Sequence, residues 1–256
     1  DRTVKIWQPG NHIPKFIGAS PSISSDGQIL VTALDKVIKI WQSNINLNQK
    51  FELKNKIQLS HNENIHNVSI SPDGKVIASA SKNGVIKFWN LDGKLIANFD
   101  AHHQKLITNI RFSPQGKIIV SSCSNTIKLW NLQGKNLASF SEKSLITKIN
   151  FSPDSKKIIS SHRDKTVKIW DLNGRLFKTL KGHKGAVLDA NFSPDGQMIA
   201  SASEDGFIRL WYLNGELISA FKAHQDFVNT VQFKVDSKIL FSIGQPDKII
   251  KIWTLD

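Results

Sequence analysis

The sequence has a single cysteine among 256 residues, so an internal disulfide is excluded. A lone thiol in a chain of this length is typical of a reducing compartment, and we expect a cytoplasmic location. No apolar run approaches the roughly 18 residues that a membrane-spanning helix requires. No charged and then apolar leader opens the sequence at Asp1. These absences favour a soluble protein or a soluble segment of one.

Motifs that carry chemistry are also missing. There is no Cys-x-x-Cys pair, and the eight histidines do not stand at the spacings of zinc ligands. The sequence has no glycine-rich phosphate loop of the Walker or dinucleotide type, and no Gly-x-Ser-x-Gly turn to present a nucleophilic serine. We therefore predict that the protein is not an enzyme, with no catalytic residue, bound metal or cofactor.

Tryptophan, in contrast, recurs at a nearly constant interval. The six intervals between the first and the last copy cover 246 residues and average 41. Each tryptophan closes an apolar, basic, apolar triplet such as Val167-Lys168-Ile169. A fixed period of about 40 residues indicates a repeat architecture in which each repeat is one supersecondary unit. The seven copies are Trp7, Trp41, Trp89, Trp130, Trp170, Trp211 and Trp253.

Turn residues divide each repeat into short runs of β-branched and aromatic residues. Ser193-Pro194-Asp195-Gly196 is one form of the first turn, in which proline presets φ and glycine supplies a positive φ. A second turn, such as Asn214-Gly215, follows the run that ends in tryptophan and is a strong hairpin signal. Because no segment has the period of a long amphipathic helix, the sequence predicts repeats of four short antiparallel strands.

Two dipeptides resemble the marks of the WD-repeat β-propeller family, namely Gly182-His183 before a first strand and Trp170-Asp171 at the end of a third. The Asn90–Lys94 hairpin further resembles the long WD-repeat arrays of prokaryotes, especially cyanobacteria. The resemblance implies one all-β domain over 1–256, a propeller of four-stranded antiparallel blades.

The seven tryptophans predict seven blades in a closed ring, with incomplete terminal blades. The pattern begins on a third strand and stops after a third strand, so two inner strands at the start and one outer strand at the end are absent. A six-bladed ring is the alternative. We expect the chain to be a segment of a larger protein.

The resemblance also implies a buried hydrogen-bond network in each blade, running from a loop histidine through a serine and an aspartate to the tryptophan. Glu142 stands where one repeat should have its histidine, and the repeat of Trp130 keeps His103. Asn83 and Ser124 replace the aspartate in two repeats, where we predict looser networks. Two repeats have every member: His183, Ser201, Asp205 and Trp211, then His224, Ser242, Asp247 and Trp253.

A Ser-His-Asp set also occurs in hydrolases, so the catalytic interpretation has to be weighed. Here the same set is predicted in at least two repeats and ends on a tryptophan, whereas catalysis needs one asymmetric site. Buried polar groups must be paired, and such a network specifies strand register. The structural role is therefore the better explanation.

The charge is one-sided, because 34 lysines and arginines outnumber 21 aspartates and glutamates by 13. A basic surface attracts phosphate, so binding of nucleic acid or of an anionic membrane is the alternative function. The residue two before the tryptophan is basic in all seven repeats, however. Charged residues at a repeated position are distributed around the molecule and are not concentrated in one patch. One set of turns is expected to be locally basic through Lys75, Lys94, Lys117, Lys135, Lys156, Lys157 and Arg175.

Recognition is expected in the loops, which a rigid propeller frame can hold and vary. The family resemblance places recognition positions beside the loop histidine and just before the network aspartate. Side chains at these positions differ between repeats, as a specific surface requires. We predict a non-catalytic scaffold or sensor module of a larger intracellular regulator, with a protein or peptide partner. The predicted binding residues are Lys82, Leu106, Lys143, Leu145, Arg163, Lys184, Glu204 and Phe227.

Overall fold

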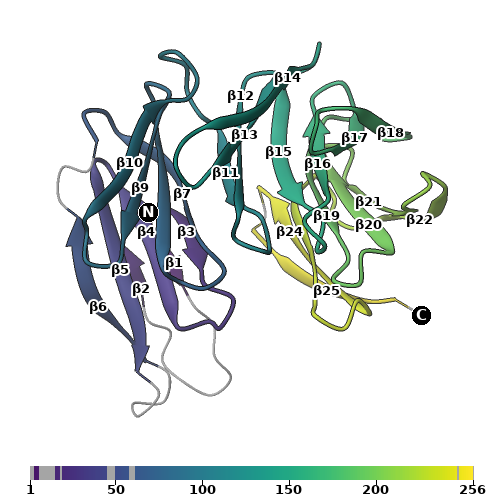
Figure 1. Ribbon diagram of the computed structural model, residues 1–256. Helices are drawn as coiled ribbons and strands as arrows, with labels where there is room; N and C mark the ends of the chain where they lie inside the picture. Colours follow the sequence, from purple (N-terminus) through teal and green to yellow (C-terminus); the bar gives the residue numbers. More distant parts are fainter. Residues whose placement is uncertain are drawn as a thin grey trace. The chain divides into compact units, whose positions relative to one another are not determined.

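The computed structural model describes residues 3–5, 15–17, 19–44, 50–57, 61–246 and 248–255. In these ranges every regular element is a β-strand and no helix occurs, which confirms the all-β prediction. Figure 1 shows the strands gathered into small successive sheets along the chain. Nothing in the described part of the chain forms a helix of the length and apolarity that crossing a membrane requires.

The first of two compact units comprises residues 1–123 and 130–136. It begins with a strand pair, β1 (Thr3–Lys5) and β2 (Lys15–Ile17). Sheet 1 follows, with β3 (Ala19–Ile23), β4 (Ile29–Leu34), β5 (Val37–Asn44) and β6 (Lys50–Ile57). Sheet 2 contains β7 (Ile65–Ile70), β8 (Val76–Ser81), β9 (Val85–Asn90) and β10 (Leu95–Asp100).

The second unit comprises residues 124–129 and 137–256. Sheet 4 contains β15 (Ile146–Phe151), β16 (Lys157–His162), β17 (Thr166–Asp171) and β18 (Leu176–Lys181). Sheet 5 contains β19 (Val187–Phe192), β20 (Met198–Ser203), β21 (Phe207–Tyr212) and β22 (Leu217–Lys222). Sheet 6 has three strands, β23 (Phe227–Phe233), β24 (Ile239–Gln245) and β25 (Ile250–Thr254).

Sheet 3 has its residues divided between the two units. Its strands are β11 (Asn109–Phe112), β12 (Ile118–Cys123), β13 (Thr126–Asn131) and β14 (Asn136–Ser141), in that order. Strands that follow one another in the chain are neighbours in every sheet. This is the consequence of joining antiparallel strands by short hairpin turns.

The blade count differs from the expected seven. Six sheets of three or four strands follow the β1–β2 pair, so the described strands form about six blades. The segment around the first tryptophan contributes only two strands of three residues each, and Trp7 itself lies outside the described residues. The described strands match the predicted ends of the repeat pattern. Two strands precede sheet 1, and sheet 6 has no outer strand. Closure into a seven-bladed ring stays a prediction.

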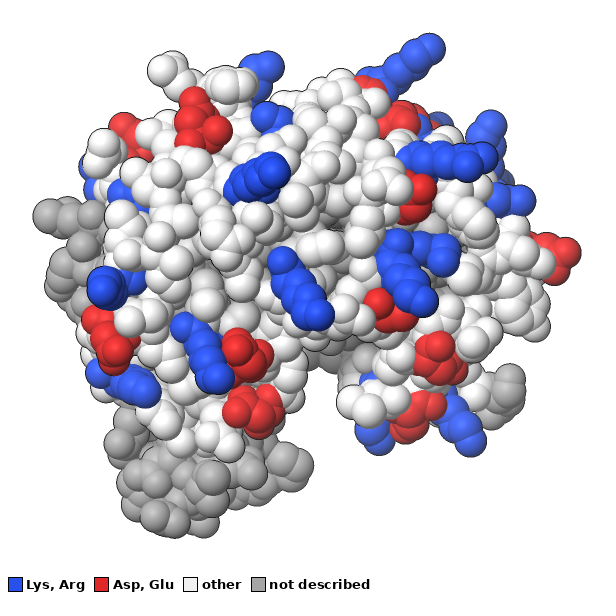
Figure 2. All heavy atoms as spheres, in the orientation of Figure 1, with Lys and Arg blue, Asp and Glu red and all other residues white. Residues whose placement is uncertain are grey.

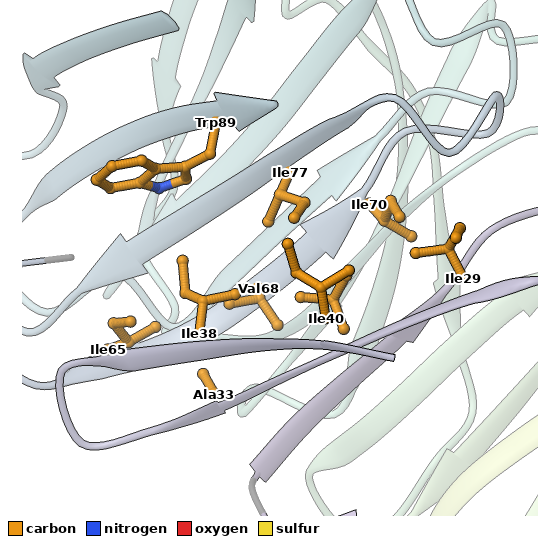
Figure 3. Close-up of a cluster of buried hydrophobic side chains, with 10 residues drawn as sticks. Ile29, Ala33, Ile38, Ile40, Ile65, Val68, Ile70, Ile77 and Trp89 are labelled. Atoms are coloured by element: carbon orange, nitrogen blue, oxygen red, sulfur yellow. The ribbon is translucent and has the colours of Figure 1, made fainter. Parts of the chain in front are cut away.

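Apolar side chains fill the space between successive sheets. In the first unit, Ile38 and Ile40 of β5 pack with Val68 and Ile70 of β7, and Figure 3 shows these side chains converging between the strands. The second unit repeats this arrangement, with Ile208 of β21 in one cluster with residues of β23. Successive residues of a strand face opposite sides of the sheet, so each sheet supplies one apolar face to the next.

Side-chain amides also join the first strands of neighbouring sheets in the second unit. Asn150 Nδ2 of β15 donates to the backbone carbonyl of Ala190 in β19 at 3.0 Å. Asn191 Nδ2 of β19 donates in the same way to the carbonyl of Val231 in β23 at 2.6 Å. Each bond reaches 40 residues along the chain. These bonds satisfy polar groups that the packing of one sheet on the next buries.

Candidate functional site

The complete His-Ser-Asp-Trp set of sheet 5 forms one continuous hydrogen-bond network. Trp211 Nε1 donates to Ser201 Oγ at 2.9 Å, and Ser201 Oγ lies 2.8 Å from His183 Nε2. His183 Nδ1 lies 3.0 Å from the Asp205 carboxylate. The network joins β21, β20, the turn between them and the loop that precedes β19. Its role is therefore to fix this loop and this turn relative to the sheet.

Arg209 extends this network, although the sequence pattern did not assign it a role there. Arg209 Nη1 lies 3.0 Å from Asp205 Oδ2 and 2.6 Å from His183 Nδ1. The three side chains are almost fully buried, with exposed fractions of 10%, 8% and 1% for arginine, aspartate and histidine. One signal was present in the sequence. This repeat alone has arginine where the other six have lysine.

Electrostatics hold Asp205 ionised. Burial alone would raise its pKa, but hydrogen bonds from His183 and from the backbone N–H groups of Lys184 and Phe207 outweigh burial and hold the pKa well below its usual range. Burial lowers the pKa of His183, and this outweighs the opposing effect of Asp205. The site is thus a fixed carboxylate between a guanidinium and an imidazole, and the loss of either charged partner would leave the other buried and uncompensated.

Sheet 6 shows the same core of the network. Ser242 Oγ lies 2.9 Å from His224 Nε2 and accepts a hydrogen bond from Trp253 Nε1 at 2.9 Å. Asp247, the predicted fourth member, lies outside the described residues.

Sheet 3 corrects the choice of histidine. His102, rather than His103, lies 2.8 Å from Ser121 Oγ, which also accepts from Trp130 Nε1 at 2.8 Å. His103 is exposed, and its ring lies 3.4 Å from the Asp100 carboxylate. The network histidine stands two residues after the end of the outer strand, as His183 and His224 also do. Counting from the outer strand would have selected His102 from the sequence.

Sheet 4 has a histidine in the network where none was expected. His162 lies at the end of β16, two residues after Ser160, so both side chains are on one face of the strand. His162 Nε2 lies 2.8 Å from Ser160 Oγ, and Trp170 Nε1 donates to the same oxygen at 2.7 Å. Glu142, which the sequence pattern placed at the histidine position, instead forms an ion pair with Lys168 of β17.

The expectation of looser networks in sheets 2 and 3 is wrong for the His-Ser-Trp part. In sheet 2, Ser79 Oγ lies 2.7 Å from His61 Nε2 and accepts from Trp89 Nε1 at 2.9 Å, distances like those of sheet 5. Asn83 instead accepts a hydrogen bond from Ser81. The strands alone position serine and tryptophan, so the aspartate is not needed to bring them together.

These buried histidines predict a loss of stability in mild acid. Burial, assisted by the nearby Lys87 and Lys168 cations, lowers the pKa of His61 to about 3 and that of His162 to about 4, from an ordinary 6.5. Between these values the unfolded chain binds more protons than the folded one. The free energy of unfolding should therefore fall as the pH is lowered from about 6.5 towards 4, measured by urea unfolding.

The variant His162→Gln should show a shallower decline, because one buried imidazole no longer takes up a proton on unfolding. The exposed His103 provides the matched control, and His103→Gln should keep the slope of the parent. An identical slope in all three proteins would contradict the assignment.

The described residues contain no group of three or more side chains suited to hold a metal ion. The His-Ser-Trp arrangement recurs in sheets 2 to 6 and ends each time on a tryptophan N–H. An arrangement that recurs in this way stabilises each sheet alike and cannot distinguish one repeat from another. We therefore look to the loops for side chains that differ between repeats.

We use the name loop rim for the loops that precede the first strands together with the turns between second and third strands. In sheet 4 the Arg163 backbone N–H donates to the carbonyl of Leu145 at 3.0 Å. In sheet 5 the Glu204 N–H donates to the carbonyl of Ala186 at 2.9 Å. Each predicted loop position thus lies beside the predicted turn position of its own sheet.

The loop rim is also continuous from sheet 5 to sheet 6. The backbone N–H of Ala223, in the loop before β23, donates to the carbonyl of Gly206 at 2.9 Å. Leu145 and Phe227 are 50% and 45% exposed, in the same range as other exposed bulky apolar side chains of the chain such as Phe177 at 55%. Three other predicted residues of the second unit are also exposed, namely Lys143, Arg163 and Lys184. Glu204 is half-buried.

The first unit carries the two other predicted binding residues. The Lys82 backbone N–H donates to the carbonyl of Asn64 at 3.0 Å, so this turn also lies against its own loop. Lys82 is exposed, and Leu106 is 39% exposed in the loop before β11. Their place in sheets 2 and 3 corresponds to that of Arg163 and Leu145 in sheet 4.

Gly206 is the position where the loop rim tolerates a side chain least. Its φ is +78°, and a Cβ would lie 2.6 Å from the Asp226 carbonyl and 2.8 Å from the His224 carbonyl. Gly206→Ala should lower the free energy of unfolding by about 2 kcal/mol or more, measured by urea unfolding. Gly27→Ala is the control, since Gly27 has φ +70° and open space around it, and it should show the backbone strain alone. Equal costs would contradict the close approach.

Comparison with known proteins agrees with this geometry. The family model described as WD domain, G-beta repeat matches residues 174–212 and 215–254, which contain the strands from β18 to β25. These two segments are thus similar to WD repeats. A second family model, described as eukaryotic translation initiation factor eIF2A, matches residues 29–184, which is more than half of the chain. These residues thereby belong to that sequence family, and they form the successive sheets from β4 to β18.

Curated WD-repeat relatives match parts of the chain. The small ribosomal subunit protein RACK1y of Oryza sativa subsp. japonica is 30% identical over 151 residues, covering 55% of this chain and 42% of the relative. Nuclear distribution protein nudF 1 of Talaromyces marneffei is 32% identical, covering 51% of this chain and 30% of the relative. Nuclear distribution protein PAC1 of Arthroderma otae is 32% identical over 200 residues, covering 72% and 39%.

The chain thus spans between 30% and 42% of the length of these three WD-repeat relatives. They come from a plant and two fungi, so the resemblance to prokaryotic arrays finds no support in them. The WD-repeat match and relatives of this kind support the prediction that the protein is not an enzyme. They also support a non-catalytic interaction module.

Proposed function

We propose that this protein is the scaffolding or sensing part of a larger intracellular regulator, and that it binds a protein or peptide on its loop rim. The observation that carries the proposal is the exposure of Leu145 and Phe227 at the ends of loops that hydrogen bonds hold against their own sheets. Exposed bulky apolar side chains beside arginine and lysine are typical of interaction surfaces. The proposed contact residues of the second unit are Lys143, Leu145, Arg163, Lys184, Glu204 and Phe227.

Lys82 and Leu106 hold the corresponding positions in the first unit, and we propose the same role for them. The similarity to WD repeats supports this function, and the non-repetitive character of these positions supports it independently. A cytoplasmic location, expected from the single cysteine, remains a prediction.

The decisive experiment replaces one exposed phenylalanine at a time. A partner obtained by affinity capture is purified, and its dissociation constant is measured by calorimetry with the parent chain and with Phe227→Ala. We expect a loss of affinity of tenfold or more, about 1.4 kcal/mol, because an aromatic anchor is removed from the interface. Arg163→Glu should weaken binding as well.

Phe177→Ala is the matched control. Phe177 lies on the outer strand β18, away from the loop rim, and is 55% exposed, so the same chemistry is removed from a comparable surface position. Its affinity should equal that of the parent. If Phe177→Ala weakens binding while Phe227→Ala leaves it unchanged, the assignment of the loop rim is wrong.

A second candidate function is binding of nucleic acid or of an anionic membrane, which the net charge of +13 favours. The cations would come from the turns that carry Lys94, Lys135 and Arg175, all of which are exposed. Figure 2 shows blue and red side chains interspersed on the face drawn, rather than one uninterrupted basic patch. Such binding would fall steeply with salt and respond to Lys94→Glu or Arg175→Glu, whereas protein binding on the loop rim would not.

A further inference from the structure

The loop rim of the second unit has more exposed cations than exposed carboxylates among its described residues. Asp164 and Asp226 are exposed, whereas Glu142 pairs with Lys168 and Asp205 pairs with Arg209 inside the network. Two carboxylates near the rim are therefore neutralised internally. The exposed cations of the rim are Lys143, Arg163, Lys165, Lys184 and Lys248, and Lys181 and Lys222 stand at the ends of β18 and β22, which lead into its loops.

These cations flank the two exposed apolar side chains. Arg163 is hydrogen-bonded through its backbone to Leu145, and Lys143 is two residues before Leu145. Near Phe227, Lys222 Nζ donates to the carbonyl of Asp205 at 3.1 Å, which holds its charge over the turn at 204–206. Each of the two exposed apolar side chains thus has exposed cations at neighbouring positions.

From this arrangement we propose that the partner segment is a linear acidic peptide that contains bulky apolar residues. Its carboxylates face the lysines and Arg163, and its apolar side chains contact Leu145 and Phe227. The inference rests on the proposed function and specifies the chemistry of the ligand. Charge complementarity of this kind steers association and selects the partner.

A nucleic acid fits the same surface less well. Asp226 directly precedes Phe227, and the backbone of Asp226 lies against the turn that carries Glu204, as the close approach at Gly206 shows. A phosphate backbone carries evenly spaced charge and would meet these two carboxylates. A peptide can place a neutral or apolar residue there and its acidic residues elsewhere.

The test selects random dodecapeptides displayed on phage against the full 256-residue chain. The Leu145→Ala/Phe227→Ala double variant serves for counter-selection. Peptides that depend on the two apolar anchors should be enriched in Asp and Glu over the unselected library and should contain a bulky apolar residue. A synthetic copy of an enriched peptide should lose tenfold or more in affinity for Lys143→Glu/Arg163→Glu/Lys184→Glu.

The control variant is Lys94→Glu/Lys135→Glu/Arg175→Glu, which removes as much charge from turns outside the loop rim and should bind the peptide like the parent. Thermal unfolding checks that each variant is folded. Anchor-dependent peptides without acidic enrichment would overturn the inference and leave the proposed function standing. Failure to recover any anchor-dependent peptide would overturn both the inference and the proposed function. The same conclusion would follow if duplex DNA displaced the bound peptides with a steep salt dependence.

Discussion

Trp211→Ala should lower the free energy of unfolding by about 3 to 5 kcal/mol, one of the largest effects of a single change in this protein. Trp211 is 3% exposed and packs in the core between sheets 4 and 5, so its removal leaves a large cavity. It also removes the N–H that Ser201 accepts, at the end of a network that continues to His183 and Asp205. Urea unfolding followed by circular dichroism measures the change.

Two further variants separate the cavity from the hydrogen bonds. Trp211→Phe keeps much of the ring volume but has no N–H, so it should cost less, about 1 to 3 kcal/mol. Trp130 is equally buried, but Ser124 stands in place of the aspartate in its network. Trp130→Ala should therefore cost less than Trp211→Ala. Equal losses would show that the extended network of sheet 5 adds nothing to the packing of the ring.

Asp205→Asn should cost about 3 to 5 kcal/mol, because it leaves the buried Arg209 guanidinium without its anionic partner. The pKa of Asp205 is held below its ordinary value of 3.8, so the stabilisation is present at neutral pH and is lost as the pH falls through the acid range below that value. The variant should lack this acid-dependent part of the unfolding free energy. The comparison is made by urea unfolding at pH 7 and at pH 3.

The sequence of sheet 2 suggests how to rescue the variant. Asn83 and Lys87 stand there where sheet 5 has Asp205 and Arg209. Asp205→Asn/Arg209→Lys should recover part of the lost stability, because a lysine can direct its ammonium group to water and an arginine in this buried position cannot. If Asp205→Asn changes the unfolding free energy by less than about 0.5 kcal/mol, the pair does not stabilise the fold.

Local features of the sequence were enough to predict the strands, and the family resemblance added the complete network of sheet 5. The turn at 193–196 shows why. The Met198 N–H donates to Ser193 Oγ at 2.9 Å and Gly196 has φ +73°, so these residues define the hairpin without distant contacts. The alternation of apolar and polar residues then fixes which face each strand buries. Because this unit repeats along the chain, its pattern was also enough to indicate the family.

Contacts between segments decided what the repeat pattern could not. His162 replaces the missing loop histidine because it stands two residues after Ser160 on the same face of β16, and the pairing of β16 with β17 brings Trp170 to the same serine. Arg209 reaches Asp205 because the turn folds the carboxylate back over β21.

The sequence by itself therefore determined the all-β repeat, the turn positions and the buried tryptophans, since these follow from interactions within about 40 residues. The tertiary structure alone decided which side chains complete each network and which loop residues share a rim. The physical reason is that a hydrogen bond depends on distance and direction to within a fraction of an ångström. A periodic pattern specifies which face a residue occupies, whereas only packed sheets bring two given atoms to that distance.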